Sequence, residues 1–136
     1  MPRKSVGEYP DNWPEIARAV KGQASWRCVR CGHEHDPAAG YTLTVHHLDL
    51  DPGNCRFWNI PALCQRCHLQ IQARVVMERP WLFEHSAWFR PYAAGYYAWV
   101  LLGQDLARDE IEARLDELLA MGQPWRISRE MEVQVG

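Results

Sequence analysis

Cysteines are the first residues of this chain whose spacing indicates a chemical role. Four of the five form two CxxC pairs: Cys28 with Cys31, and Cys64 with Cys67. A CxxC turn brings two thiolates to one ion, and two such turns supply the four soft ligands of a closed tetrahedral zinc site. The cysteines therefore predict a structural Zn²⁺ held by Cys28, Cys31, Cys64 and Cys67.

Other interpretations of the cysteines stay open. The four thiols could instead be reduced and buried as small apolar side chains. A redox role is less favoured, because no strand–helix pattern of the thioredoxin type surrounds either pair. His33 and His35 follow the first pair and are alternative ligands, although four cysteines already complete the site. The unpaired Cys55 is interpreted as a small loop or core residue.

Three histidines lie between or beside the cysteine pairs. His46 and His47 end the apolar segment 41–48, and His68 follows Cys67 where a helix is expected to begin. A neutral imidazole can act as a general base near pH 7, and imidazoles can hold a divalent ion while leaving positions for water and substrate. A helix N-terminus also attracts phosphate. Because neighbours in an extended strand point to opposite faces, His46 and His47 can act together only where the strand bends or ends.

The elements that must position these residues follow from patterning. We expect a helix at 11–20, capped by Asp11 or Asn12 and ended by Gly22. The β-branched and aromatic segment 41–48 predicts a strand, 49–59 a loop, and residues from 67 or 68 to about 77 a helix.

The second half of the sequence predicts helices. A helix ending at Gly103 is expected to present one aromatic face, formed by Trp88, Tyr92, Tyr96 and Trp99. Asp105 is expected to cap another helix, which Gly122 stops. Its expected buried stripe is Ile111, Leu115, Leu118 and Leu119. Residues 126–135 suit an edge strand or a frayed end.

Composition limits the class of protein. A chain of 136 residues that is 47% hydrophobic suits one domain with a modest core. The net charge is only −2, and the sequence has neither a basic nor an acidic tail. The N-terminus has no apolar signal core, and the apolar run 93–103 is too short for a bilayer span, so we expect a cytoplasmic protein with no membrane partner.

Four motifs occur in a fixed order: "CVRC", "VHHL", "NIPALC" and "CQRCH". Together they resemble the HNH endonuclease family in its zinc-stabilised version, over about residues 24–77. The resemblance implies an α+β fold with a small ββα-metal core at 24–77, flanked by an N-terminal helix and a C-terminal helical extension at 80–122, within a single domain 1–136.

The resemblance also implies roles for individual residues. His47 matches the general base that activates water, and Asn59 the residue that ties the loop to the strand and orients that base. His46 and His68 match the ligands of a catalytic ion. Some members have a further histidine where this chain has Gln72. Two ligands favour a hard, hydrated ion, so the expected catalytic cofactor is Mg²⁺ or Mn²⁺.

The expected activity is hydrolysis of DNA phosphodiester bonds, leaving 5′-phosphate and 3′-hydroxyl ends. Arg56, Arg66 and Arg74 are candidate phosphate contacts, with solvated surface arginines as the equal alternative. Phe57 and Trp58 are expected to pack against the hairpin rather than wedge into DNA. Two other functions stay open: a catalytically inactive zinc-stabilised DNA-binding module, and a protein-interaction domain. The C-terminal helices offer a surface for dimerisation.

Overall fold

The computed structural model describes residues 8–72, 75, 77 and 79–124. The chain divides into two compact units, Met1–Val76 and Met77–Gly136. The expected edge strand or frayed end at 126–135 lies outside the described residues. Within them, none of the helices combines the length and the apolar character that crossing a membrane requires.

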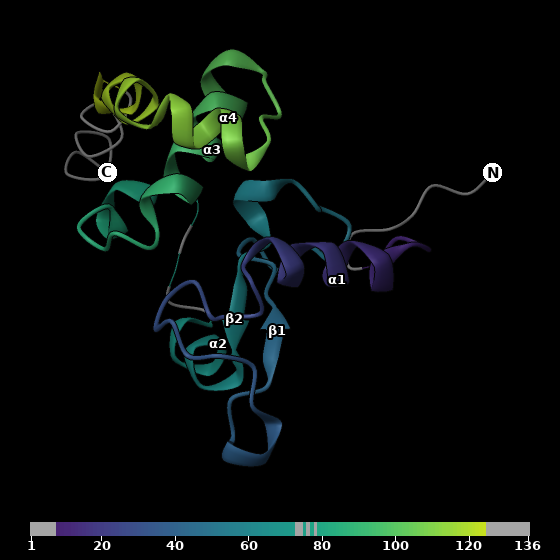
Figure 1. Ribbon diagram of the computed structural model, residues 1–136. Helices are drawn as coiled ribbons and strands as arrows, with labels where there is room; N and C mark the ends of the chain where they lie inside the picture. Colours follow the sequence, from purple (N-terminus) through teal and green to yellow (C-terminus); the bar gives the residue numbers. More distant parts are fainter. Residues whose placement is uncertain (1–7, 73–74, 76, 78, 125–136) are drawn as a thin grey trace, which may run out of the picture. The chain divides into compact units, whose positions relative to one another are not determined.

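The first unit contains a two-stranded antiparallel sheet. Strand β1 (Leu43–Val45) pairs with β2 (Ala62–Cys64), and Thr44 lies opposite Leu63. Helix α2 (Gln65–Ile71) follows β2 directly and packs against the sheet (Figure 1). The fold is therefore α+β, as the sequence predicted.

Strand β1 is shorter than the predicted strand at 41–48. Its ladder ends at Val45, and beyond it the His46 N–H donates to the carbonyl oxygen of Pro61 at 3.2 Å. Pro61 has no N–H to return, so regular pairing stops there. Both His46 and His47 consequently lie just past the strand, between the His46 N–H bond to Pro61 and the Leu48 N–H bond to the Asn59 carbonyl.

Helix α1 (Trp13–Gln23) lies two to three residues further along the chain than the predicted 11–20 and packs against β1. Asn12 is the N-cap, but its side chain makes no capping hydrogen bond. Gly22 does not end the helix. The chain leaves it through Ser25 and Trp26, which both have positive φ angles, 55° and 56°.

Helix α2 is also shorter than predicted. It begins at Gln65, where the Cys64 Sγ accepts a hydrogen bond from the Cys67 N–H, and it ends before Gln72 rather than near 77. The predicted loop 49–59 contains a short 3₁₀ helix, η2 (Phe57–Asn59). Within it Trp58 is buried, in agreement with the packing role expected for it.

The second unit is helical over most of its described residues. It contains the 3₁₀ helix η3 (Pro80–Phe83), α3 (Arg90–Leu102) and α4 (Arg108–Ala113), and residues 115–124 are helical too. Gly103 ends α3 in the left-handed conformation, as predicted.

The predicted aromatic face of α3 is wrong in part. Trp88 precedes the helix, and Tyr96 and Trp99 are only half-buried. Between residues 92 and 98 the helix is instead buried on nearly all sides, and its buried residues combine large rings with small side chains, which allow close packing. These residues are Tyr92, Ala93, Ala94, Gly95, Tyr97 and Ala98.

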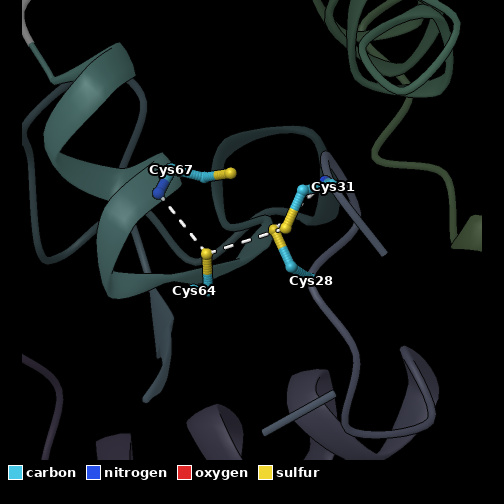
Figure 2. Close-up of side chains that lie close together, drawn as sticks. All are labelled: Cys28, Cys31, Cys64 and Cys67. Atoms are coloured by element: carbon cyan, nitrogen blue, oxygen red, sulfur yellow. Dashed lines mark hydrogen bonds between the residues drawn. The ribbon is translucent and has the colours of Figure 1, made fainter. Parts of the chain in front are cut away.

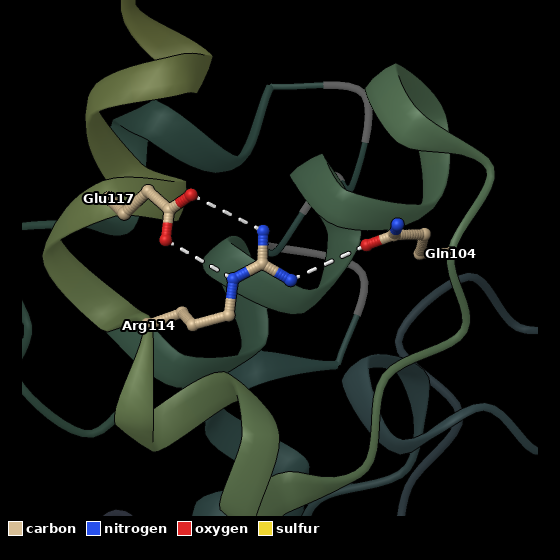
Figure 3. A network of polar contacts seen from close by, with 3 residues as sticks. All are labelled: Gln104, Arg114 and Glu117. Atoms are coloured by element: carbon tan, nitrogen blue, oxygen red, sulfur yellow. Dashed lines mark hydrogen bonds and ion pairs between the residues drawn. The ribbon is translucent and has the colours of Figure 1, made fainter.

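The helix predicted from Asp105 to Gly122 is interrupted. Ala107, not Asp105, is the N-cap of α4, and the helix breaks at Arg114 before resuming at 115. At the break the Arg114 guanidinium donates to both carboxylate oxygens of Glu117, at 3.2 and 3.4 Å, and to Gln104 Oε1 at 3.4 Å (Figure 3). Ile111, Leu118 and Leu119 are buried as predicted.

Gly122 continues the helix instead of stopping it. A Cβ atom added there would lie 2.4 Å from Cε2 of Tyr97, a fully buried ring that cannot retreat. The glycine therefore provides room for Tyr97 between two helical segments.

We expect Gly122→Ala to destabilise the protein by about 1–3 kcal/mol, since overpacking forces a buried ring to shift. Gly22→Ala is the matched control, because an added Cβ in α1 meets nothing within 4 Å. That control should stabilise by roughly 0.5–1 kcal/mol through helix propensity. Chemical denaturation followed by circular dichroism measures both, and an unchanged midpoint for Gly122→Ala would contradict the packing argument.

Candidate functional site

The four paired cysteines converge on one point. Their Sγ atoms all lie within 4.8 Å of one another. Cys28 and Cys31 come from the loop after α1, whereas Cys64 and Cys67 come from the end of β2 and the first turn of α2 (Figure 2). Residues 32–63 separate the two pairs in the sequence, and the fold brings the pairs together.

The two CxxC turns share the same local hydrogen bond. The Cys31 N–H lies 3.5 Å from Cys28 Sγ, and the Cys67 N–H lies 3.4 Å from Cys64 Sγ. The Gly32 N–H closes the first turn on the Cys28 carbonyl at 2.9 Å, with φ at 78°. Backbone N–H groups directed at sulfur favour its thiolate form.

Burial makes uncompensated thiolates costly at this cluster. Cys28, Cys64 and Cys67 are buried. Desolvation raises the pKa of Cys67 to about 12, and it also raises the pKa of Cys31. A coordinated metal ion offsets this cost and deprotonates its thiol ligands. The donor set therefore fits a structural metal such as zinc.

The alternative ligands near the first CxxC pair have other contacts. The His33 ring stacks on Tyr41 with centroids 3.5 Å apart, and His35 Nδ1 accepts a hydrogen bond from the Leu43 N–H at 2.9 Å. Cys55 lies outside the cluster, with its Sγ 3.7 Å from the Pro52 carbonyl oxygen.

His46 and His68 form a second close group. His46 comes from the end of β1 and His68 from α2, and their ring centroids lie 4.3 Å apart at 49°. Burial, together with smaller contributions from the neighbouring His68 and His47, lowers the pKa of His46 to about 4. Burial also lowers the pKa of His68. Both rings are thus neutral near pH 7, as metal ligands must be.

The site at His46 and His68 offers two metal ligands of the common types, the two imidazole rings. In the described part of the chain, the cysteines are the only group of three or more such residues close enough to share an ion. Gln72, at the C-cap of α2, is exposed. An ion between His46 and His68 would therefore keep open positions.

His47 lies beneath an aromatic cover that the sequence did not predict. Its ring contacts Trp13 and Tyr9, with centroids 4.7 and 5.7 Å away. The side chain is buried, and its Nε2 has no hydrogen-bond partner among the described residues. Burial lowers the pKa of His47, while Asp49 and Asp51 act in the opposite direction. No local sequence pattern connects Tyr9 and Trp13 to a histidine more than 30 residues away.

Asn59 braces the loop that follows the histidines. It is fully buried, and its Oδ1 accepts a hydrogen bond from the Asp49 N–H at 2.9 Å. Its Nδ2 donates to Asp49 Oδ1 and to the Asn54 carbonyl, both at 2.8 Å. The Asn59 carbonyl accepts from the Leu48 N–H at 2.8 Å, which fixes the chain just after His47.

Asp49 is the other centre of this network and was not singled out from the sequence. Its Oδ2 accepts a hydrogen bond from Asn54 Nδ2 at 2.7 Å, and its Oδ1 also accepts from the Asp51 N–H at 2.9 Å. The motif "HHLD" placed this carboxylate two residues after His47, and that spacing was the available signal.

The candidate phosphate contacts differ in their surroundings. Arg66 donates to the carbonyls of Gly40 and Ala39, at 3.3 and 3.1 Å, and lies over the Tyr41 ring. Arg56 Nη1 donates to Asn54 Oδ1 at 3.1 Å. Arg66 therefore ties the loop at 37–41 to α2. Arg74 lies outside the described residues.

Comparison of the chain with protein-family models, with curated proteins and with solved structures finds no match. Its function is therefore inferred from the residues and their geometry.

We expect the purified protein to contain one zinc ion that depends on the cysteine cluster. Cys64→Ser should lose the zinc and the folded state of the first unit, because three ligands remain around a buried centre. Cys55→Ser is the matched control and should keep both. Elemental mass spectrometry and circular dichroism measure the two properties. Full zinc occupancy in Cys64→Ser would contradict the assignment.

Replacement of Asn59 should loosen the loop at 49–54. Asn59→Ala removes its hydrogen bonds to the Asp49 N–H, to Asp49 Oδ1 and to the Asn54 carbonyl, at a cost of about 0.5–1.5 kcal/mol for each bond. Asn59→Asp keeps the shape but places a second carboxylate against Asp49, so it should destabilise as well. Asn12→Ala, at an exposed cap without a side-chain hydrogen bond, should stay within about 0.5 kcal/mol of wild type. Urea denaturation compares the three, and a stable Asn59→Ala would show that the network contributes little.

Proposed function

We propose that the chain is a metal-dependent HNH endonuclease of the ββα-metal fold that hydrolyses DNA phosphodiester bonds. The observation that carries the proposal is the 4.3 Å approach of the His46 and His68 rings. These histidines belong to separate motifs of the family pattern, and a shared cation explains why the fold places the half-buried His68 ring beside the buried His46 ring.

The order of elements supports the same proposal. Strands β1 and β2 and helix α2 follow one another in the chain. The cysteine cluster fixes the β2–α2 junction, and the ladder between β1 and β2 holds the strand that leads to His46. This is the arrangement that a ββα-metal core requires.

His46 and His68 would hold Mg²⁺ or Mn²⁺ in the proposed enzyme. Two neutral imidazoles leave positions for water and for a phosphate oxygen, although such ions generally prefer oxygen ligands. When bound, the ion supplies electrostatic stabilisation of the charge that develops on the phosphate and on the leaving oxygen.

His47 would act as the general base. Its lowered pKa keeps the ring neutral, so a ring nitrogen can take a proton from water while the water oxygen attacks phosphorus in line. The bond from phosphorus to the 3′ oxygen breaks, leaving a 5′-phosphate. The hydrogen bonds of Asn59 to Leu48 and Asp49 would hold the chain just after His47 in place.

The aromatic cover places a condition on this mechanism. The Nε2 atom of His47 is buried beside Trp13 and Tyr9, so these rings must move before that nitrogen can meet water. Tyr9 is 54% exposed, so its ring already lies partly in solvent. Bound DNA would supply the free energy for this movement.

Burial of His47 favours a second candidate, a zinc-stabilised DNA-binding module without catalytic activity. In this case the cover would stay closed and the histidines would be structural. A protein-interaction domain, with the zinc purely structural, is the third class.

A plasmid-nicking assay on zinc-loaded protein separates enzyme from binding module. With added Mg²⁺ or Mn²⁺ we expect cleavage, and His47→Ala should lower its rate by about 10²–10⁴-fold, the usual contribution of a general base. His85→Ala, an exposed histidine of the second unit, is the matched control and should cut like wild type.

The control measurements make the result decisive. Zinc content must be equal in all variants. A lower cleavage rate can then be assigned to the substitution and not to unfolding of the protein. Equal background cleavage by wild type and His47→Ala would end the enzyme proposal. A gel shift without added divalent ion would then distinguish a DNA-binding module from an interaction domain.

A further inference from the structure

We propose that Thr44 is a positioning residue that selects the tautomer of His68 and thereby makes Nε2 its metal-binding atom. The inference rests on the proposed function, since it concerns the ion that His46 and His68 would share. It is carried by two hydrogen bonds of one hydroxyl group, which connects the sheet to α2.

The Thr44 hydroxyl has a single hydrogen atom, and this determines which of its two hydrogen bonds it donates. Thr44 Oγ1 lies 2.7 Å from the Leu63 carbonyl oxygen and 2.9 Å from His68 Nδ1. A carbonyl oxygen only accepts, so the single hydroxyl hydrogen is directed at Leu63. The contact with His68 must then be Nδ1–H donating to Oγ1. In a neutral ring this leaves Nε2 unprotonated, with its lone pair available.

The sheet fixes the hydroxyl in this position. Thr44 and Leu63 are opposite each other in the β1–β2 ladder, so the carbonyl that orients the hydroxyl is set by the strand register. Threonine is β-branched and therefore stiff at χ1. Three groups on β1, β2 and α2 are thus linked through one oxygen atom.

The consequence for a bound ion is direct. A histidine ligand usually donates its other ring N–H to a protein group, and that bond fixes both the tautomer and the orientation of the ring. His68 has such a partner in Thr44. In a ring with the proton on Nε2, the same nitrogen would have to lose it before it could bind a cation.

The test compares Thr44→Val with Thr44→Ser. Valine keeps the branched shape and removes the hydroxyl, whereas serine keeps the hydroxyl. Long-range ¹H–¹⁵N NMR spectra of the zinc-loaded protein, without Mg²⁺ or Mn²⁺, report the His68 tautomer directly. We expect the Nδ1-protonated form in wild type and Thr44→Ser, and its loss in Thr44→Val.

Titration with Mn²⁺, followed by electron paramagnetic resonance, provides the second measurement. Thr44→Val should bind Mn²⁺ about 10–100-fold more weakly than wild type, the range found for lost outer-shell partners. Thr44→Ser should bind close to wild type. Equal zinc content in the three proteins controls for folding.

Two results would overturn the inference. One is an NMR spectrum that shows the His68 ring of the wild type protonated at Nε2. This measurement uses the wild-type protein alone, so it does not depend on whether a variant folds. The other is equal Mn²⁺ affinity of wild type and Thr44→Val. If wild type binds no Mn²⁺ and cuts no DNA, the proposed function fails, while the NMR measurement still decides whether Thr44 sets the tautomer.

Discussion

The cysteine cluster is the constraint on which the first unit depends. The β1–β2 ladder has three residue pairs and α2 has seven residues, and elements this short are marginal alone in water. Structural zinc contributes about 10–16 kcal/mol in small zinc-finger peptides. This is comparable to the whole stability of a typical domain, about 5–15 kcal/mol. A metal at the four sulfur atoms would thus add to the stability that the small apolar core, which includes Leu43, Trp58 and Leu63, provides.

The same cluster determines where the histidines lie. Cys64 ends β2 and caps α2, so a metal ion bound to its Sγ would also constrain the angle between sheet and helix. His68 follows Cys67 directly, so the position of Cys67 in the cluster also determines where His68 lies. His46 follows the last residue of β1, which the ladder holds against β2. The Thr44 hydroxyl connects β1 to the His68 ring. Each of the two histidines therefore follows directly on a residue that the ladder or the cysteine cluster positions.

Much of the candidate site could be predicted because the residues concerned occur in short motifs with a regular spacing. The two CxxC pairs predicted the sulfur cluster, and Asn59 was expected to brace the loop. Element ends were predicted less well, because tertiary contacts decide them. Pro61 ends a strand from the opposite side of the ladder, and Gly122 makes room for Tyr97 rather than ending a helix. The cover of His47 by Tyr9 and Trp13 depends on long-range packing that no short motif encodes.

The central claim is that the chain holds two separate ions, one at the sulfur cluster and one at the paired imidazoles. Anomalous diffraction from crystals of the zinc-loaded protein soaked with Mn²⁺ tests it most directly. We expect zinc bound to four sulfur atoms and a distinct manganese peak between His46 and His68. Crystals that bind zinc but show no manganese at the histidines, or that hold the two rings apart, would contradict it.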